Sequence, residues 1–416
     1  MVKTIHPSKI KGSIIAPPSK SLTQRAIAAA LMSRGTSDII SPSYCSDSLA
    51  ALKIVTKLGA KVVEDKKGFR ISGSSEAVAG QILNCGESGL AMRMFSPVAA
   101  MLTSSTTFTG EGSLLKRPVS MISDALRQSG ITIVSSEGYL PLTLTGRLLG
   151  GRYEIDGSTG SQLLTGLLIA LPLADCDSEI IVHDLKSKPY ISLTIKLMND
   201  FGITVENFNF RRFFIPGRQA YNAREYVIEG DWSGAAFLLV AGLTCGEVTV
   251  DNLSTDSKQA DVAVMKAFHK AGARIDVIAN RVKAKKGELM PFDFDATQCP
   301  DLFPPLACLA VNCMGTSRIK GVSRLEHKES NRALAIVQVL QTMGVEVSIH
   351  DDVMNVKGGP VVGNAVSSHN DHRIAMMASI AALSGSGYTR ISIAEAVKKS
   401  YPDFFDNLIT LGARIN

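Results

Sequence analysis

The stretch Lys53-Ile-Val-Thr-Lys-Leu-Gly59-Ala-Lys-Val-Val63 joins an amphipathic segment, through a glycine, to a short run with β-strand character. Five later segments have the same form: DALRQSGITIV, KLMNDFGITVE, KAFHKAGARID, QVLQTMGVEVS and NLITLGARIN. The glycines of the six segments are Gly59, Gly130, Gly202, Gly272, Gly344 and Gly412, at intervals of 71, 72, 70, 72 and 68 residues. Such regular spacing indicates an internal repeat. Each glycine suits the left-handed residue that ends a helix before a strand.

A second series of polar turns keeps the same phase, and each turn precedes an apolar helical segment. These turns fall at Ser21, Ser88, Ser161, Ser233, Asp301 and Asp371. Each unit therefore contains a strand, a buried helix, a strand, a second helix ending in glycine, and a hairpin. The prediction is an α/β fold of six such units, with helices buried inside mixed sheets.

The last repeat stops four residues after Gly412, so it lacks the hairpin of the other copies. Residues Met1 to Ile15 read as strands and are expected to supply it from the other end of the chain. We therefore predict two lobes of three units each. The first lobe is 19–230, and the second is 1–18 plus 231–416.

Composition narrows the class of protein. The chain has 416 residues, is 45% hydrophobic, and carries 44 basic and 38 acidic residues, a net charge of +6. This mild charge does not indicate a nucleic-acid binder, but it suits small acidic substrates. No stretch is apolar for the length of a membrane span, and the seven cysteines form no C-x-x-C pair. We predict a cytoplasmic protein with no membrane or nucleic-acid partner.

Basic residues recur where helices are expected to begin. In Ala16-Pro-Pro-Ser-Lys-Ser-Leu-Thr-Gln-Arg25, both Lys20 and Arg25 oppose the helix dipole, where Asp or Glu would be favoured. Similar positions are Arg93, Lys116, Arg117, Lys188, Lys328, Arg332, Arg373 and Lys399, with prolines 118, 189 and 402 expected in first helical turns. The pattern predicts bound anions, and the number of donors indicates two multiply charged ligands.

Two carboxylates lie among these cations, Asp301 and Glu329, and they are candidates for proton transfer. Two structural alternatives remain open: Glu329 as a first-turn partner of the helix dipole, and Asp301 as a cap after Pro300. His369 and His372 have a spacing that would suit a metal, but the adjacent Arg373 disfavours a cation, so no metal is predicted. There is neither a G-x-x-x-x-G-K-[ST] loop nor a strand-bounded G-x-G-x-x-G motif.

Seven motifs in order along the chain resemble the 3-phosphoshikimate 1-carboxyvinyltransferase family of enolpyruvyl transferases. They are PSKSLTQRA, KRPVSMISDAL, DGSTGSQLLTGLL, SKPYI, HKESNR, NDHRIAM and KKSYPDFF. The resemblance implies the two-lobed enolpyruvyl transferase fold. It also implies transfer of the enolpyruvyl group from phosphoenolpyruvate to the 5-hydroxyl of shikimate 3-phosphate, with no cofactor, and we expect a monomer.

The resemblance also implies roles for individual residues. Lys20, Asp301 and Glu329 would be catalytic, with Asp301 accepting the hydroxyl proton and Glu329 donating to the methylene carbon. The residues expected to hold shikimate 3-phosphate are Lys20, Ser21, Arg25, Ser161, Gln162, Ser187, Tyr190, Asp301 and Lys328. The residues expected to hold phosphoenolpyruvate are Lys20, Gly89, Arg117, Gln162, Arg332, Arg373 and Lys399.

Some positions depart from the family pattern. The loop that commonly reads G-N-A-G-T-A-M-R has Glu87 and Leu90 here, which leaves its substrate contacts and the response to glyphosate open. Gly160 stands where a serine is frequent, and Arg324 where an asparagine is frequent. Two other functions remain as alternatives. One is UDP-N-acetylglucosamine enolpyruvyl transfer, although the segment between Gly110 and Pro118 lacks the reactive cysteine of that group. The other is a non-catalytic module that binds polyanions or RNA ends.

Overall fold

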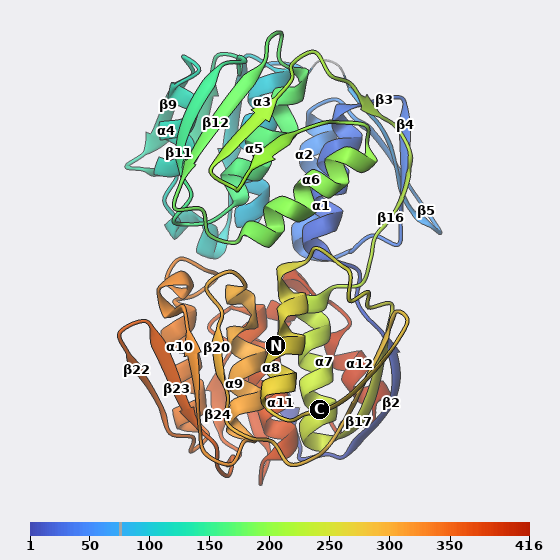
Figure 1. Cartoon of the computed structure of the whole chain (residues 1–416), viewed down its shortest axis with the longest axis vertical. Coiled ribbons are helices and arrows are strands. Elements are labelled where there is room, and N and C mark those ends of the chain that lie inside the picture. The colour runs from blue at the N-terminus through green and yellow to red at the C-terminus, as the bar shows by residue number, and fades with distance from the viewer. Residues whose placement is uncertain (75–76) are drawn as a thin grey trace. The chain divides into compact units, whose positions relative to one another are not determined.

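The computed structural model describes residues 1–74 and 77–416, and the chain divides into two compact units (Figure 1). One unit comprises Met1–Pro17 with Glu229–Asn416, and the other comprises Pro18–Ile228. The chain passes between the units twice, since the first contains both the beginning and the end of the sequence. None of the described helices combines the length and the apolar character that a membrane span requires.

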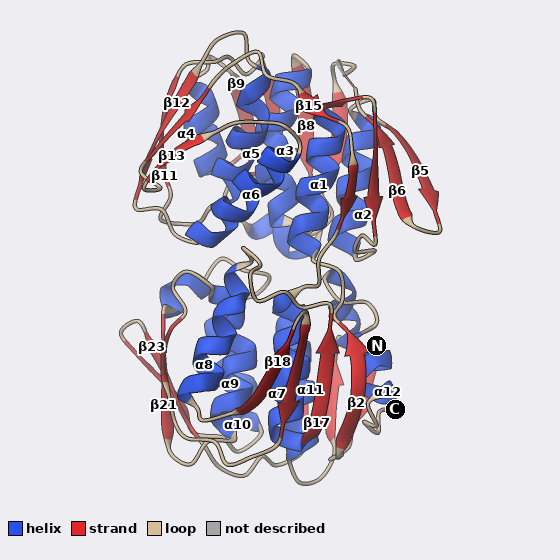
Figure 2. Cartoon of the chain, turned by 45° about the vertical axis from the view of Figure 1, so that its right-hand side comes forward, coloured by secondary structure: helices blue, strands red, loops and turns tan. Residues whose placement is uncertain are grey.

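In the unit of residues 18–228, three four-stranded sheets surround buried helices (Figure 2). The helices are α1 (Lys20–Met32), α2 (Ser46–Lys57), α3 (Gly89–Leu102), α4 (Ser120–Arg127), α5 (Gln162–Ala170) and α6 (Lys188–Asp200), with 3₁₀ segments η1 (Gly112–Lys116) and η2 (Leu171–Leu173). The strands are β3 (Ser33–Arg34), β4 (Thr36–Ile40), β5 (Lys61–Asp65), β6 (Gly68–Ser72), β7 (Gln81–Asn84), β8 (Ser105–Thr109), β9 (Thr132–Ser136), β10 (Tyr139–Thr145), β11 (Arg152–Asp156), β12 (Ser178–His183), β13 (Glu206–Phe208), β14 (Arg212–Ile215), β15 (Tyr221–Asn222) and β16 (Glu225–Val227).

The other unit repeats this plan. Its helices are α7 (Trp232–Cys245), α8 (Val264–Lys270), α9 (Phe303–Val311), α10 (Arg332–Thr342), α11 (His372–Ser384) and α12 (Phe404–Thr410), with 3₁₀ segments η3 (Ala260–Ala263), η4 (Pro300–Leu302), η5 (Val322–Leu325) and η6 (Ala394–Lys399). Its strands are β1 (Val2–Ile5), β2 (Ile10–Ile15), β17 (Gly246–Asp251), β18 (Arg274–Ile278), β19 (Arg281–Lys285), β20 (Asp293–Asp295), β21 (Thr316–Lys320), β22 (Val347–His350), β23 (Val353–Lys357), β24 (Ala365–Ser367) and β25 (Thr389–Ser392).

The sheets share one topology, which confirms the predicted α/β class with mixed sheets. In the sheet β11-β12-β14-β13, the first pair is parallel and the next two pairs are antiparallel. The sheets β7-β8-β10-β9 and β20-β21-β23-β22 have the same order of parallel and antiparallel pairs. The first helix of each repeat lies inside its unit: α3 packs on α5, and α7 contacts both α9 and α11. Every residue of α7 is buried, because its sequence is apolar on all sides.

Each of the six repeat glycines has the left-handed backbone that the sequence predicted. Their φ angles lie between 64° and 103°, at Gly59, Gly130, Gly202, Gly272, Gly344 and Gly412. At these points a side chain would strain the backbone, and glycine ends the helix without that cost.

The N-terminal residues complete the last repeat, as expected. Strand β1 pairs antiparallel with β25, and Thr4 exchanges two backbone hydrogen bonds with Asn416. Strand β2 has a second role, since it lies parallel to β17 and serves as the first strand of the fourth repeat. Strand β16 serves as the first strand of the first repeat, where it lies parallel to β4.

Several predicted helix starts are shifted. Helix α1 is capped by Ser19 and α7 by Asp231, so both begin before the polar turns placed at Ser21 and Ser233. Pro189 lies in the first turn of α6, whereas Pro118 and Pro402 precede α4 and α12 by two residues. The reason at Pro118 is that Lys116 ends the separate 3₁₀ segment η1 and Arg117 is its C-cap, directly before the proline.

Candidate active site

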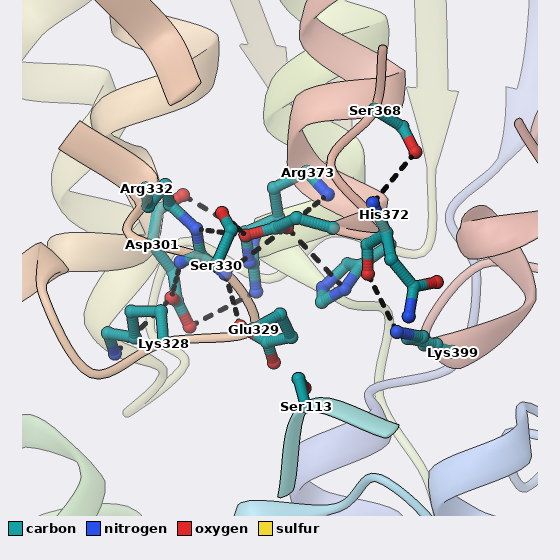
Figure 3. Close-up of polar contacts among 12 residues, drawn as sticks. Ser113, Asp301, Lys328, Glu329, Ser330, Arg332, Ser368, His372, Arg373 and Lys399 are labelled. Carbon is teal, nitrogen blue, oxygen red and sulfur yellow. Dashed lines mark hydrogen bonds and ion pairs between the residues drawn. The ribbon is translucent and has the colours of Figure 1, made fainter. Parts of the chain in front are cut away.

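Arg332, the first residue of α10, is the centre of a buried cluster of carboxylates (Figure 3). Its Nη1 donates to Asp301 Oδ1 at 2.8 Å and its Nη2 to Glu329 Oε2 at 2.5 Å. Its Nε donates to Asp371 Oδ2 at 2.9 Å. The Arg332 side chain has no exposed surface. Three carboxylates on one guanidinium hold Asp301 and Glu329 side by side.

Asp301 also receives contacts from two further cations. Arg373 Nη2 lies 3.1 Å from Asp301 Oδ2, and Lys328 Nζ lies 3.7 Å from Asp301 Oδ1. Burial alone would raise the pKa of Asp301, but the positive charges of Arg373, Lys328 and Arg332 outweigh it and hold that pKa below its usual value. Burial lowers the pKa of Lys328, and Asp301 opposes this shift. Asp301 is therefore the ionised counter-ion of a cation cluster.

The turn before α11 positions Asp371, Arg373 and Lys399. Asp371 caps α11 by accepting from the Arg373 N–H, and it also accepts from the Ser330 hydroxyl. Lys399, at the end of η6, donates to the Asn370 carbonyl at 2.7 Å. The unit of residues 1–17 and 229–416 thus gathers Asp301, Lys328, Glu329, Arg332, Arg373 and Lys399 around the starts of α10 and α11.

Several of the basic residues at helix starts have carboxylate partners within the protein. Arg332 is neutralised by three carboxylates of the protein itself. Lys20 makes an ion pair with Asp47, with 3.0 Å between Nζ and Oδ2. A cation at a helix N-terminus therefore does not by itself demand an external ligand. The two structural alternatives also fail in detail, because Asp301 caps no helix and Glu329 lies before α10.

The other unit contains basic residues with neutral partners. Arg25, in α1, donates to the hydroxyls of Thr194 and Thr165 and to the Ser21 carbonyl. Its guanidinium carbon lies 5.8 Å from the centre of the Tyr190 ring. Burial lowers the pKa of Arg25 to about 10. Within residues 1–74 and 77–416, no carboxylate lies at ion-pair distance from Arg25. The charge of this buried guanidinium is therefore not balanced by a carboxylate of the described residues.

A second group converges on Gly89, the first residue of α3. A Cβ at Gly89 would lie 2.7 Å from Arg117 Nη1 and 2.8 Å from Arg93 Nη1. Arg93 Nη1 donates to Gln162 Oε1 at 2.9 Å, and Arg117 Nη2 donates to the Ser113 hydroxyl at 3.2 Å. Two guanidinium groups beside the N–H groups of a helix N-terminus have the charge and the donors that an anion needs. Glycine is required at position 89 because a methyl group would fill the space next to both guanidiniums.

The remaining predicted residues of this unit lie at the starts of buried helices. Ser21 lies in the first turn of α1, Ser161 immediately precedes α5, and Ser187 precedes α6 with a left-handed backbone. The N–H of Gly160 donates to the Gly157 carbonyl, so that amide is already used within the loop. Leu90 is buried in the core of this unit, so the bulky side chain is turned into the apolar packing.

Sequence reasoning left four site residues out of its assignments. Arg93 stands among the basic residues at helix starts but is assigned to neither substrate, although it lies on the same helix as Gly89, four residues on. Asp371 stands among the polar turns but is given no role at the site. Asp47 and Asp261 pair with Lys20 and Ser233, which are distant in sequence, and no local pattern marks them. Among the described residues, no group of three or more His, Cys, Asp or Glu side chains is placed to hold a metal ion.

Comparison with known proteins agrees with the motifs. Residues 5–408 match the family described as EPSP synthase (3-phosphoshikimate 1-carboxyvinyltransferase). Curated proteins named 3-phosphoshikimate 1-carboxyvinyltransferase are similar over nearly the full length. Those of Clostridium novyi and Clostridium kluyveri are 36% and 37% identical, with 99% of this chain and 98% of each relative covered. That of Methanocella arvoryzae is 37% identical, with both chains covered completely.

Solved structures share the fold. EPSP synthase from Acinetobacter baumannii superposes with a TM-score of 0.84 at 24% identity, covering 100% of this chain and 99% of that one. The enolpyruvyl transferase NikO from Streptomyces tendae superposes with a TM-score of 0.80 at 18% identity, covering 100% and 98%. These structures establish the fold, and the sequence matches establish the family. The chain therefore belongs to the EPSP synthase (3-phosphoshikimate 1-carboxyvinyltransferase) family.

Proposed function

We propose that this protein transfers the enolpyruvyl group of phosphoenolpyruvate to the 5-hydroxyl of shikimate 3-phosphate and releases phosphate. The observation that carries the proposal is that Asp301 and Glu329 bind the same buried guanidinium, that of Arg332. An acid and a base held together beside anion-binding groups suit a reaction that moves protons on anionic substrates. Membership of the family supports the choice of substrates.

We assign phosphoenolpyruvate to two sets of basic residues. One set is Arg117 with Gly89 and Gln162, to which the geometry adds Arg93. The other set is Arg332, Arg373 and Lys399. Lys20 is assigned to both substrates and is held by Asp47 in the absence of ligand. Bidentate guanidiniums match the geometry of phosphate and carboxylate groups, which supports this assignment.

We assign shikimate 3-phosphate to the surroundings of Arg25 and to Lys328. Arg25 is a buried cation that contacts the hydroxyls of Thr194 and Thr165, the Ser21 carbonyl and the Tyr190 ring. Ser21, Ser161, Gln162, Ser187 and Tyr190 complete this assignment, and Asp301 would accept from the 5-hydroxyl. A sugar-like phosphate needs one strong cation for the phosphate and hydroxyl partners for its ring, and this set supplies both.

The proposed chemistry has two stages. In the first, the 5-hydroxyl oxygen forms a bond to C2 of phosphoenolpyruvate while Asp301 takes the hydroxyl proton and Glu329 protonates C3. In the second, the tetrahedral intermediate loses phosphate, the methyl group returns its proton to Glu329, and the hydroxyl proton leaves with phosphate. Arg332 and Arg373 currently bind Asp301, so an entering carboxylate would compete for them and make Asp301 more basic.

Substitution of the two carboxylates tests the function. Asp301→Ala and Glu329→Gln should each lower kcat by about 10²–10⁴-fold, because each removes one proton-transfer group. The measurement is phosphate release with both substrates, and Glu346→Gln, an exposed carboxylate of the same unit, is the control. Absence of turnover by the parent protein with these substrates, or full activity of both variants, would refute the proposal. Turnover with UDP-N-acetylglucosamine in place of shikimate 3-phosphate would favour the related transferase.

We also propose that the protein acts as a monomer in the cytoplasm and needs no nucleic-acid or membrane partner. Its cysteines support a reducing compartment, since none of the seven forms a disulfide and six are buried. The modest net charge supports small acidic substrates over a polyanion. Light scattering during gel filtration, with and without both substrates, measures the oligomeric state, and a mass of about twice 44.4 kDa would reject the monomer.

A further inference from the structure

We propose that Glu87 is a positioning residue for the Arg117 part of the phosphoenolpyruvate site. Its carboxylate holds the 3₁₀ segment η1, and η1 in turn sets the place of the Arg117 guanidinium. The inference rests on the proposed function for the identity of the anion, but the contacts that carry it lie entirely within residues 18–228.

The first step is the contact between Glu87 and the start of η1. Glu87 Oε2 accepts a hydrogen bond from the Ser113 backbone N–H at 3.0 Å. The carboxylate also lies against Gly112, since a Cβ there would be 2.5 Å from Glu87 Cδ and Oε2. Gly112 has a φ of 52°, which glycine adopts without strain. The loop is thus shaped to receive this carboxylate.

A second bond fixes the same two segments. The Glu111 N–H donates to the Gly86 carbonyl at 2.7 Å, directly beside the Glu87 contact. Leu114 of η1 is fully buried, which anchors the other side of the segment. Residues 86–87 and 111–114 are therefore held together by a backbone bond, a carboxylate bond and apolar packing. Of these three, only the Glu87 bond involves a charged side chain.

The second step leads from η1 to the guanidinium. Ser113 donates its backbone N–H to Glu87, and its hydroxyl oxygen accepts a hydrogen bond from Arg117 Nη2 at 3.2 Å. Arg117 is buried, and its Nη1 lies 2.7 Å from the place a Cβ of Gly89 would take. Among the described residues, no carboxylate pairs with Arg117, so Ser113 is the partner that orients it. A shift of Ser113 would move the guanidinium away from Gly89.

If Glu87 acted only through its negative charge, its removal would have the opposite effect on the binding of phosphoenolpyruvate. A carboxylate close to an anion site repels the ligand, so removal of its charge would tighten binding. Positioning depends on the acceptor oxygen, which glutamine retains. Comparison of Glu87→Gln with Glu87→Ala therefore separates the two roles.

The kinetic test measures the KM of each substrate and kcat. Loss of a charged hydrogen bond corresponds to about a tenfold change in affinity, so Glu87→Ala should raise the KM for phosphoenolpyruvate about tenfold. The KM for shikimate 3-phosphate and kcat should change less than about threefold, and Glu87→Gln should stay within about threefold of the parent. Gly112→Ala should resemble Glu87→Ala because it displaces the carboxylate. Asp65→Ala, which removes a carboxylate–amide bond from the β5–β6 hairpin, is the control and should leave all constants unchanged.

Hydrogen exchange provides a test that does not depend on turnover. In the substrate-free protein, peptides covering residues 110–117 should exchange faster in Glu87→Ala and Gly112→Ala than in the parent, and Glu87→Gln should restore protection. Unchanged exchange together with an unchanged KM would overturn the proposal, as would a lower KM in both Glu87 variants. A parent protein without turnover would refute the proposed function, while the exchange experiment would still decide whether Glu87 positions η1.

Discussion

At the scale of single residues, Asp261 is the buried acid whose surroundings least suit its charge. It is 1% exposed, and its carboxylate accepts from the Ser233 hydroxyl. Burial, and then the negative charge of Asp301, raise the pKa of Asp261 to about 7. Arg373 opposes this shift, but it is shared with Asp301. Asp261 therefore changes its charge near neutral pH.

This pKa makes the stability of the unit depend on pH. Because the folded pKa of Asp261 lies above the unfolded value, the folded state binds more protons between about pH 4 and pH 7. The stability from the protonated acid is lost as pH rises through that window. Asp261→Asn keeps an acceptor for the Ser233 hydroxyl. Because the amide does not ionise, this variant does not lose stability as the pH rises. Its free energy of unfolding relative to the parent should increase by about 1–3 kcal/mol from pH 5 to pH 8.

Trp232 is the single tryptophan and begins α7, so its fluorescence during denaturant unfolding reports on the unit that contains Asp261. Unfolding midpoints at pH 5 and pH 8 give the comparison. Asp231→Asn is a useful control, since it changes a neighbouring carboxylate that caps α7. A difference between Asp261→Asn and the parent that stays constant with pH would show that Asp261 does not titrate in this window.

The residue-level predictions from sequence identified cations better than their counter-ions. Lys20 and Arg332 stand out because each opposes a helix dipole, a rule that needs only neighbouring residues. Their partners Asp47 and Asp371 lie 27 and 39 residues away along the chain, and only the fold brings them together. The sequence therefore marks these two cations but not the carboxylates, Asp47 and Asp371, that pair with them in the fold.

At the scale of helices and strands, the contact between α3 and α5 depends on a glycine. A Cβ at Gly166, within α5, would lie 2.5 Å from the Met94 carbonyl oxygen and 2.9 Å from Pro97 Cγ. Gly166→Ala should therefore push the two helices apart and cost about 1–3 kcal/mol. Gly130→Ala has open space around it but a φ of 76°, so it should cost about 1–2 kcal/mol through the backbone alone.

Hydrogen exchange distinguishes the two effects. Gly166→Ala should reduce the protection of α3 and α5 amides together, whereas Gly130→Ala should affect only the end of α4 and the start of β9. Full protection of α3 in Gly166→Ala would contradict the close packing of these helices.

The elements themselves were largely predictable, because a repeated glycine and a repeated apolar helix need no long-range information. The prediction was wrong at Pro118 and Pro402, which lie between a 3₁₀ segment, η1 or η6, and the start of the next α-helix. Pro118 and Pro402 favour an extended residue before them, so the α-helix begins later than the proline suggests. Over such short segments, sequence patterns distinguish a 3₁₀-helix from an α-helix only weakly.

At the scale of the whole molecule, each unit is completed by a strand from a distant part of the chain. The missing hairpin of the last repeat pointed to the N-terminal residues, and β1 fills that place. The roles of β2 and β16 gave no such signal, because a strand of three to six residues pairs with any suitable edge. The fold decides their partners, β17 and β4, more than 180 residues away in sequence.

The pairing of β1 predicts that a change at residue 4 destabilises the C-terminal part of the fold. Thr4→Pro removes the N–H that donates to the Asn416 carbonyl at 2.8 Å, in a strand with partners on both sides. The free energy of unfolding followed by Trp232 fluorescence should fall by roughly 1–3 kcal/mol. Thr4→Ala keeps the N–H and should unfold close to the parent. Exchange protection of β12, in the other unit, should not change in either variant. Equal unfolding of Thr4→Pro and Thr4→Ala would mean that β1 adds little to the stability of this unit, because β25 and the C-terminal residues would then hold their places without it.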